Sequence, residues 1–378
     1  MKPTIFSLQT LLRDGLVALS LAGSSLLSAQ PLTTQYAARL TPPPVYACLY
    51  TPEPPQIDGN VDEHVWERAV AISQLHDIQG EGFPKPSLPT EIRMLWDSTY
   101  LYVAARLVEP YIEATLATHD DIVWHENDFE VFLDPDGDGL GYFEIEINAL
   151  GTLLDLQMSQ PYRSGGHFFT AWNCPGIRRA VKLEGTLSDS TQRDTAWTIE
   201  MAIPHRALAV DFNDALAQSR VWRMNFSRVE WLHRQGPEEN WVWAPTGVVD
   251  IHMPERWGYV CLVDSLNEPA DAVKAETPYR PDDYRFLWLL FYTQKDFYAQ
   301  HHRYISRLQD FPLAPEDFAL LHLDAAHGSA ASLPADGRGA EPQVEVSATP
   351  RAFELSLRRD SLVLVLDQNG YFSVERDE

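Results

Sequence analysis

Apolar and polar residues alternate with a period of two through much of residues 52–264, as Phe143, Ile145 and Ile147 alternate with Glu144 and Glu146. Successive side chains of a strand point to opposite faces, so this pattern predicts strands with one face on an apolar core. Turn-forming residues separate the strands at short intervals, which favours an all-β fold, an antiparallel β-sandwich or jelly roll. The expected strands are 92–96, 100–105, 129–133, 143–148, 153–158, 181–187, 197–203, 222–229 and 259–263, with short helices at 62–69 and 204–208.

The pattern changes after Asn267. Pro281 and the two acids that follow it suit the first turn of a helix. We expect an aromatic-rich helical extension over 280–311 that packs against the sandwich; a surface for a partner protein is the alternative. The apolar residues that recur there at helical spacing are Tyr284, Leu287, Trp288, Phe291 and Tyr292.

The two ends of the chain carry different signals. Residues 1–29 join basic residues to a short apolar run and small residues, which is typical of a cleaved signal peptide, so we expect an exported, periplasmic or secreted protein. No later apolar stretch is long enough to cross a membrane. At the other end, a Gly-, Ala- and Pro-rich stretch at 328–342 predicts a linker, and Asn369-Gly370 predicts a terminal β-hairpin within a segment at 343–378.

The chain is strongly acidic, because 29 Lys and Arg residues against 54 Asp and Glu residues give a formal charge of −25. Nucleic acids and anionic membrane surfaces are bound largely through Lys and Arg, so we expect neither as a partner. Cys48, Cys174 and Cys261 allow one disulfide at most and lack the spacing of a zinc site. An uncharged hydrophilic ligand fits this composition best.

Four pieces of the sequence, in order, resemble family 9 carbohydrate-binding modules, and together they cover roughly residues 45–265. They are Ile57-Asp58-Gly59 followed by Trp66, Leu95-Trp96-Asp97 followed by Tyr100, the stretch 128–134, and Arg256-Trp257-Gly258-Tyr259. The resemblance implies a β-sandwich that binds sugars without catalysis. It also implies structural calcium.

The resemblance implies a sugar site at Trp124 and Glu130. In the family, a Trp lies six residues before a Glu on the following strand, and both contact the sugar. A flat indole covers the apolar face of a sugar ring, and a carboxylate binds hydroxyls at its rim. Burial of Trp124 in a core is the alternative. The family's second clamping Trp falls at Ile251, so we consider Trp241 or Trp243 as a replacement. The family's arginine falls at Glu146.

Two rows of polar residues occur on neighbouring predicted strands. Glu144 and Glu146 belong to one row, and Arg223 and Asn225 belong to the other. Solvated strand faces would account for each row alone. If both rows line one sheet face with Trp124, we expect Glu130 and Arg223 to bind hydroxyls, with Glu144, Glu146 and Asn225 in support.

Asp134, Asp136 and Asp138 precede Gly139 as in the first half of an EF-hand loop. Ile145, however, stands where that loop needs a bidentate Glu. A structural calcium site and a plain acidic hairpin turn both remain open for these residues.

These observations favour an exported, non-catalytic protein that binds plant or microbial polysaccharide of the xylan or glucan type. One alternative is a glycoside hydrolase acting through Glu144 and Glu146, because two acids on one strand face lie about 6.5–7 Å apart. Another is a structural partner in a surface polysaccharide-utilisation complex, acting through the aromatic helix. The sequence contains no nucleophile elbow, P-loop, HExxH motif or dinucleotide fingerprint.

Overall fold

The structure is a computed structural model that describes residues 30–189, 191–209, 215–231, 236–265, 277, 279–321 and 342–376. The expected signal peptide at 1–29 and nearly all of the expected linker at 328–342 lie outside the described residues. Within these ranges, no helix combines the length and the apolar character that a bilayer-spanning segment requires.

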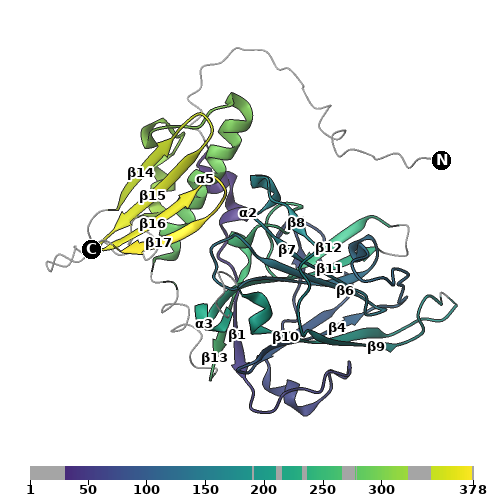
Figure 1. Cartoon of the computed structure of the whole chain (residues 1–378). Helices are drawn as coiled ribbons and strands as arrows, with labels where there is room; N and C mark the ends of the chain where they lie inside the picture. The colour runs from purple at the N-terminus through teal and green to yellow at the C-terminus, as the bar shows by residue number, and fades with distance from the viewer. Residues whose placement is uncertain are drawn as a thin grey trace, which may run out of the picture.

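A 13-stranded curled sheet forms the larger part of the molecule (Figure 1). Its order is β8-β7-β6-β5-β11-β13-β1-β3-β4-β10-β9, with β12 beside β11 and β2 beside β12. Strand β1 runs parallel to β13 and β3, whereas the other described pairs are antiparallel. The strands are β1 (Val45–Tyr50), β2 (His76–Asp77), β3 (Thr90–Trp96), β4 (Tyr100–Val108), β5 (Asp128–Asp134), β6 (Phe143–Asn148), β7 (Leu153–Met158), β8 (Phe168–Phe169), β9 (Arg178–Glu184), β10 (Ala196–Pro204), β11 (Val221–Trp231), β12 (Glu238–Val242) and β13 (Gly258–Val263).

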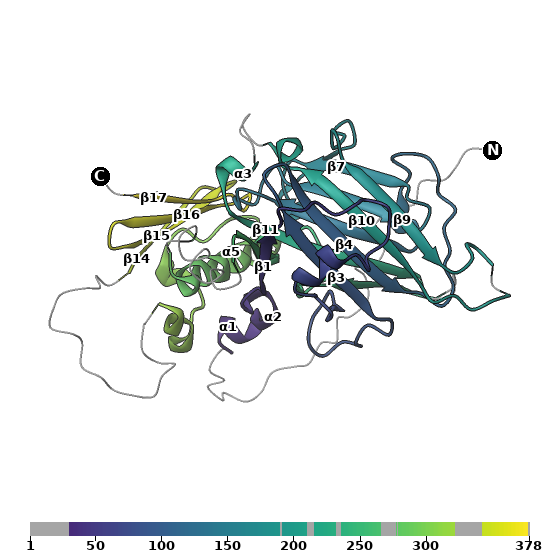
Figure 2. The ribbon, with the colours of Figure 1, turned by 90° about the horizontal axis from the view of Figure 1, so that it is seen from below.

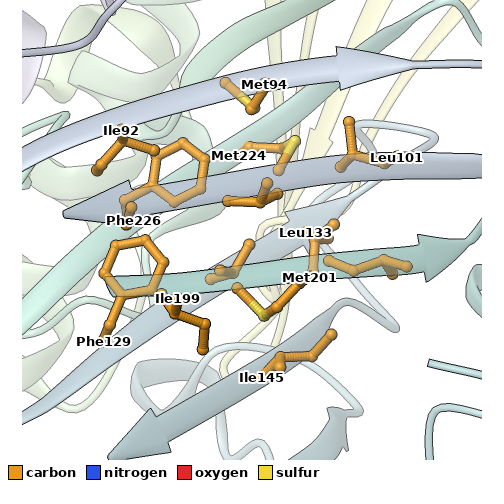
Figure 3. Packing of buried hydrophobic residues seen from close by; sticks show 14 of the residues in the cluster. Ile92, Met94, Leu101, Phe129, Leu133, Ile145, Ile199, Met201, Met224 and Phe226 are labelled. Carbon is orange, nitrogen blue, oxygen red and sulfur yellow. The ribbon is translucent and has the colours of Figure 1, made fainter. Parts of the chain in front are cut away.

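The main core lies inside the curl of this sheet. Strands β3, β4 and β10 face β5, β6 and β11 there, and Figure 3 shows their apolar side chains packed together. Phe129 and Phe226 stack with their ring centroids 5.9 Å apart, in the same cluster as Ile92 and Met94. The alternating residues of each strand therefore divide between this core and the opposite face, and the expected β-sandwich is confirmed.

A buried carboxylate explains the first motif of the sequence. Glu200, on β10, accepts hydrogen bonds from the Trp66 indole at 2.7 Å and from the backbone amides of Asp58 and Gly59. Gly59 has φ of +86°, and a Cβ there would lie 3.0 Å from Lys182, so a larger residue does not fit. This motif therefore fixes the chain to the sheet and does not form a ligand site.

The C-terminal part is a second structural unit beside the curled sheet (Figure 2). The expected hairpin forms its last two strands, but two further strands complete a four-stranded antiparallel sheet. Helix α5 (Pro281–His301) packs on this sheet, mainly on β15 and β16. The strands are β14 (Gln343–Ala348), β15 (Phe353–Arg359), β16 (Leu362–Asp367) and β17 (Phe372–Arg376).

The aromatic residues of α5 belong to the core of this second unit. Every residue from 286 to 294 is buried, and the cluster includes Trp288, Phe291 and Tyr292. The expected packing partner was the sandwich, but most of the helix is covered by the C-terminal sheet and by helices near the N-terminus. These side chains are therefore already covered by the chain itself. The remaining helical segments are α1 (Leu32–Gln35), α2 (Ala37–Leu40), α3 (Ala215–Gln218), η1 (His64–Arg68), η2 (Val123–His125), η3 (Tyr162–Ser164), η4 (His205–Leu208), η6 (Pro254–Arg256), η7 (Leu308–Asp310) and η8 (Pro315–Leu320).

Specific polar contacts join the two units. The Tyr292 hydroxyl and the Arg163 guanidinium both donate to the Glu255 carboxylate, each at 2.9 Å. The Phe372 amide donates to the Asp138 carbonyl at 3.1 Å. The three cysteines, in contrast, are buried and free, so no disulfide contributes to these contacts.

We predict that Phe291→Ala lowers the free energy of unfolding by about 3–5 kcal/mol, because it opens a cavity in the second core. Denaturant unfolding measures this change. The exposed Gln300 of the same helix provides the control, and Gln300→Ala should change stability by no more than about 0.5 kcal/mol. Equal effects of the two substitutions would contradict the described packing.

Candidate functional site

Strand pairing brings the polar rows of the sequence onto one face of the sheet. Glu130 of β5 lies directly opposite Glu146 of β6 and, on its other side, opposite Ser227 of β11. Their apolar neighbours in sequence point into the main core. The polar residues therefore occupy the face of β5, β6 and β11 that is turned away from that core.

A pocket of about 620 Å³ opens on this outer face. Trp124, Glu130, Glu144 and Glu146 line it together, so for these residues the structure favours the shared face over separate solvated faces. Further lining comes from residues that the sequence analysis did not select, among them Tyr162, Phe168, Asn240, Val249 and His252. The pocket thus combines an acidic floor with apolar and aromatic walls.

Trp124 presents its ring to the pocket. Its neighbour Val123 is fully buried and anchors η2, whereas the Trp124 side chain remains 39% exposed. The Trp231 indole donates to the Trp124 carbonyl at 3.1 Å, and the His125 ring lies edge-on to the Trp124 ring at 4.1 Å. The backbone is held while the indole is accessible, so Trp124 is not a core residue.

The opposite wall comes from two other segments. Tyr162, in η3, and Phe168, in β8, follow β7 along the chain and are 45% and 50% exposed. Ile251 is held by the buried Trp257, whose indole donates to the Ile251 carbonyl at 2.8 Å. The only sequence signal for Tyr162 and Phe168 was the presence of aromatic residues among turn-forming residues.

Two predicted site residues, Arg223 and Asn225, have side chains that are used inside the protein. The Arg223 guanidinium is buried over the Tyr259 ring and donates to the carbonyls of Pro254 and Glu255, because η6 covers this end of the face. The Asn225 side chain is buried and bonded to the Ala244 backbone. Both predictions are therefore corrected, since these polar groups are used inside the protein.

The prediction for Trp243 is corrected as well. Trp243 is 7% exposed and packs in the main core, edge-on to Tyr46, and the other candidate, Trp241, is 1% exposed in the same core. The Trp243 ring atoms lie so close to Gly258 that a Cβ there would come within 2.4 Å. Trp243 therefore cannot form the second aromatic face of the pocket, a place that Tyr162 and Phe168 take instead.

The sequence pattern of one protein family matches residues 57–265, more than half of the chain. The family is described as carbohydrate family 9 binding domain-like. The chain belongs to this family. The match includes the pocket residues from Trp124 to His252 and ends before α5, so the C-terminal unit lies outside the family 9 domain.

Three similar proteins illustrate the comparison. Endo-1,4-beta-xylanase A of Thermotoga maritima is 28% identical over 136 residues, which are 34% of this chain but only 11% of that enzyme. A crystal structure from Bacteroides uniformis, of a protein proposed to bind carbohydrate, is 16% identical and covers 59% of this chain and all of its own, with a TM-score of 0.47. A family 9 module of Caldicellulosiruptor kristjanssonii in complex with cellotriose is 13% identical and covers 59% of this chain and 96% of its own, with a TM-score of 0.40.

The carboxyl groups of the family 9 pocket hold their protons unusually tightly. Burial raises the pKa of Glu130 to about 8 and that of Glu144 to about 7, and repulsion between the two carboxylates adds to the effect on Glu130. Burial also raises the pKa of Glu146 well above its usual value, and Glu144 and Glu130 raise it further. Strand pairing forces these like charges together on a buried face.

Neighbouring groups relieve only part of this repulsion. Glu144 and Glu146 share a hydrogen bond, which lowers the pKa of Glu144 and raises that of Glu146. His252 lies 4.0 Å from Glu144, but burial and Arg163 lower the pKa of His252 to about 3. His252 is therefore neutral near pH 7 and does not balance the acidic charge.

The acidic hairpin between β5 and β6 has hydrogen bonds of its own. The two carboxylate oxygens of Asp134 accept the amides of Gly137 and Gly139, each at 3.1 Å. Asp138 accepts the Leu140 amide at 2.7 Å. One oxygen from each of Asp134, Asp136 and Asp138 lies within 4.8 Å of the other two, a spacing that suits one calcium ion. Calcium at this turn stays a prediction.

We predict that in a chelator-containing buffer the protein loses stability as the pH rises from about 4.5 to about 8. Unfolded Glu residues ionise near pH 4.5, whereas the folded Glu144 and Glu130 keep protons up to about pH 7 and 8. Their contribution is therefore complete below the unfolded pKa and is lost as the pH passes the folded pKa.

Glu146→Gln removes one of the crowded charges. Over this pH range we expect the melting temperature of the variant to fall by several degrees less than that of the wild type. The exposed Glu67 offers a matched control, and Glu67→Gln should leave the pH profile unchanged. A Glu146→Gln profile that coincides with the wild-type profile would contradict the assigned repulsion.

Proposed function

We propose that the family 9 domain binds carbohydrate at this pocket without catalysing a reaction. The supporting observation is the accessible Trp124 indole beside the Glu130 carboxyl group, six residues apart in a loop and strand that face one hollow. Sugar rings offer apolar C–H faces and polar rims, and the pocket offers aromatic surfaces around a floor of hydrogen-bonding groups. A volume of about 620 Å³ falls within the usual range of small-ligand sites.

The finer part of the proposal concerns the ligand and the location. We infer that the ligand is a plant or microbial polysaccharide of the xylan or glucan type, which is consistent with the family and with the local match to an endoxylanase. We also infer that the protein is exported, because residues 1–29 read as a signal peptide.

We expect Trp124→Ala to weaken binding of xylo- or cello-oligosaccharides at least tenfold, measured by titration calorimetry, because the substitution removes the stacking surface. Tyr371, on the C-terminal unit, has the same 39% exposure and lies outside the pocket. Tyr371→Ala should bind as the wild type does. Unchanged binding by Trp124→Ala would refute the assigned site.

A second pair of substitutions tests the opposite wall. Phe168 and Phe169 form β8 and are equally exposed at 50%, but only Phe168 lines the pocket. Phe168→Ala should weaken oligosaccharide binding about three- to tenfold, and Phe169→Ala should not. The same titration measures both variants, and equal effects would exclude this wall from the site.

The hydrolase alternative requires that Glu144 and Glu146 flank a glycosidic bond. Glycosidases of the retaining class hold their two carboxyl groups about 5–5.5 Å apart on either side of the substrate. Here Glu144 and Glu146 project from the same face of one strand, β6, so both reach a bound sugar from the same side. We therefore expect no release of reducing ends from a panel of polysaccharides, and release that Glu146→Gln abolishes would favour the hydrolase instead.

A further inference from the structure

Three carboxylates converge at and beneath the floor of the pocket, where Glu130 and Glu146 line it and Asp128 is fully buried. Asp128 and Glu130 project from the same face of β5, and Glu146 lies opposite Glu130 on β6. One oxygen from each of the three lies within 4.8 Å of the other two. All three side chains are at least nine-tenths buried, with exposed fractions of 0%, 5% and 2%.

Several oxygens in this cluster have no hydrogen bond of standard geometry. They include both carboxylate oxygens of Asp128 and one of Glu146. Asp317, another fully buried carboxylate of this chain, accepts backbone amides from Leu32, Thr33 and Ala314. Buried carboxylates are normally satisfied in this way, so unpaired oxygens at one site indicate that a binding partner belongs there.

No positively charged side chain among the described residues forms an ion pair with the cluster. Arg228, on the neighbouring β11, lies opposite Phe129, so its side chain leaves the sheet on the other face from the cluster. There it pairs with Glu109 and Glu230. Burial raises the pKa of Asp128 well above its usual value, Glu130 and other carboxylates raise it further, and the Val229 amide lowers it in part. Among the described residues, no basic side chain therefore serves as a counterion for these carboxyl groups when they ionise.

We propose that Asp128, Glu130 and Glu146 bind one divalent cation of the calcium type at the floor of the pocket. Calcium prefers carboxylate oxygens at 2.3–2.6 Å, so its ligands lie up to about 5 Å apart, as this cluster allows. Magnesium needs ligands at about 2.0–2.1 Å in a strict octahedron, which favours a tighter cluster. Glu130 and Glu146 line the pocket, so the cation reaches the site from there.

The cation would also face the ligand. Calcium takes six to eight oxygens, so three carboxylate groups leave coordination positions on the pocket side for water or for the hydroxyls of a bound sugar. This second step depends on the proposed carbohydrate function. The binding of the metal itself does not, because it follows from the carboxylates alone.

The test titrates the full chain, first treated with a chelator, with calcium chloride in the absence of sugar. We expect saturable binding by calorimetry and a rise in melting temperature with calcium concentration. Asp128→Asn keeps the shape of the side chain, and it should weaken this site at least tenfold. Magnesium should bind at least tenfold more weakly than calcium.

The matched control is Asp136→Asn, which alters the acidic hairpin and leaves the pocket carboxylates in place. It should keep the calcium site that Asp128→Asn loses. The proposal is overturned if wild-type protein binds no calcium, if binding is lost in Asp136→Asn but kept in Asp128→Asn, or if magnesium binds as tightly. Oligosaccharide affinity that is equal with and without calcium overturns the hydroxyl coordination alone.

Discussion

The direct opposition of Glu130 and Glu146 on a buried sheet face is the constraint on which the site depends. Register fixes it, because a slip of one residue would turn Phe129, Val131 and Ile147 out of the main core. The packing energy of that core thus holds the like charges together, whatever their repulsion. Such local conflicts between stability and charge are concentrated at functional sites, where a ligand or ion relieves them.

The two units of the chain are connected through the wall of the pocket. Arg163 follows Tyr162, which lines the pocket, and its guanidinium donates to Glu255 and lies over the rings of Trp288 and Phe291 at 5.6 and 5.7 Å. The aromatic helix therefore supports a loop of the family 9 domain as well as its own sheet. This contact gives the C-terminal unit a physical role at the wall of the pocket.

The sequence was sufficient for most strands of the main sheet, because alternation with a period of two marks strands and the residues that point away from the core, but it gave no expectation for β1, β2, β8 or β12. The shared polar face was one of two alternatives, and the strand register decides it. For Trp124 the sequence left a sugar site and burial in a core as alternatives, and its place beside the buried Val123 decides for exposure. The sequence could not place Arg223 and Trp243, since their fates depend on which loop covers each end of the face, and alternation carries no such information. Tyr162 was missed for the same reason, because its loop reaches the pocket only through tertiary packing.

The most direct test of the account is a crystal structure of the protein grown with calcium and a xylo- or cello-oligosaccharide. The account predicts a sugar ring stacked on the Trp124 indole, with a hydroxyl group within hydrogen-bonding distance of the Glu130 carboxylate. A sugar bound at another surface, or a pocket that stays free of sugar under saturating oligosaccharide, would contradict it.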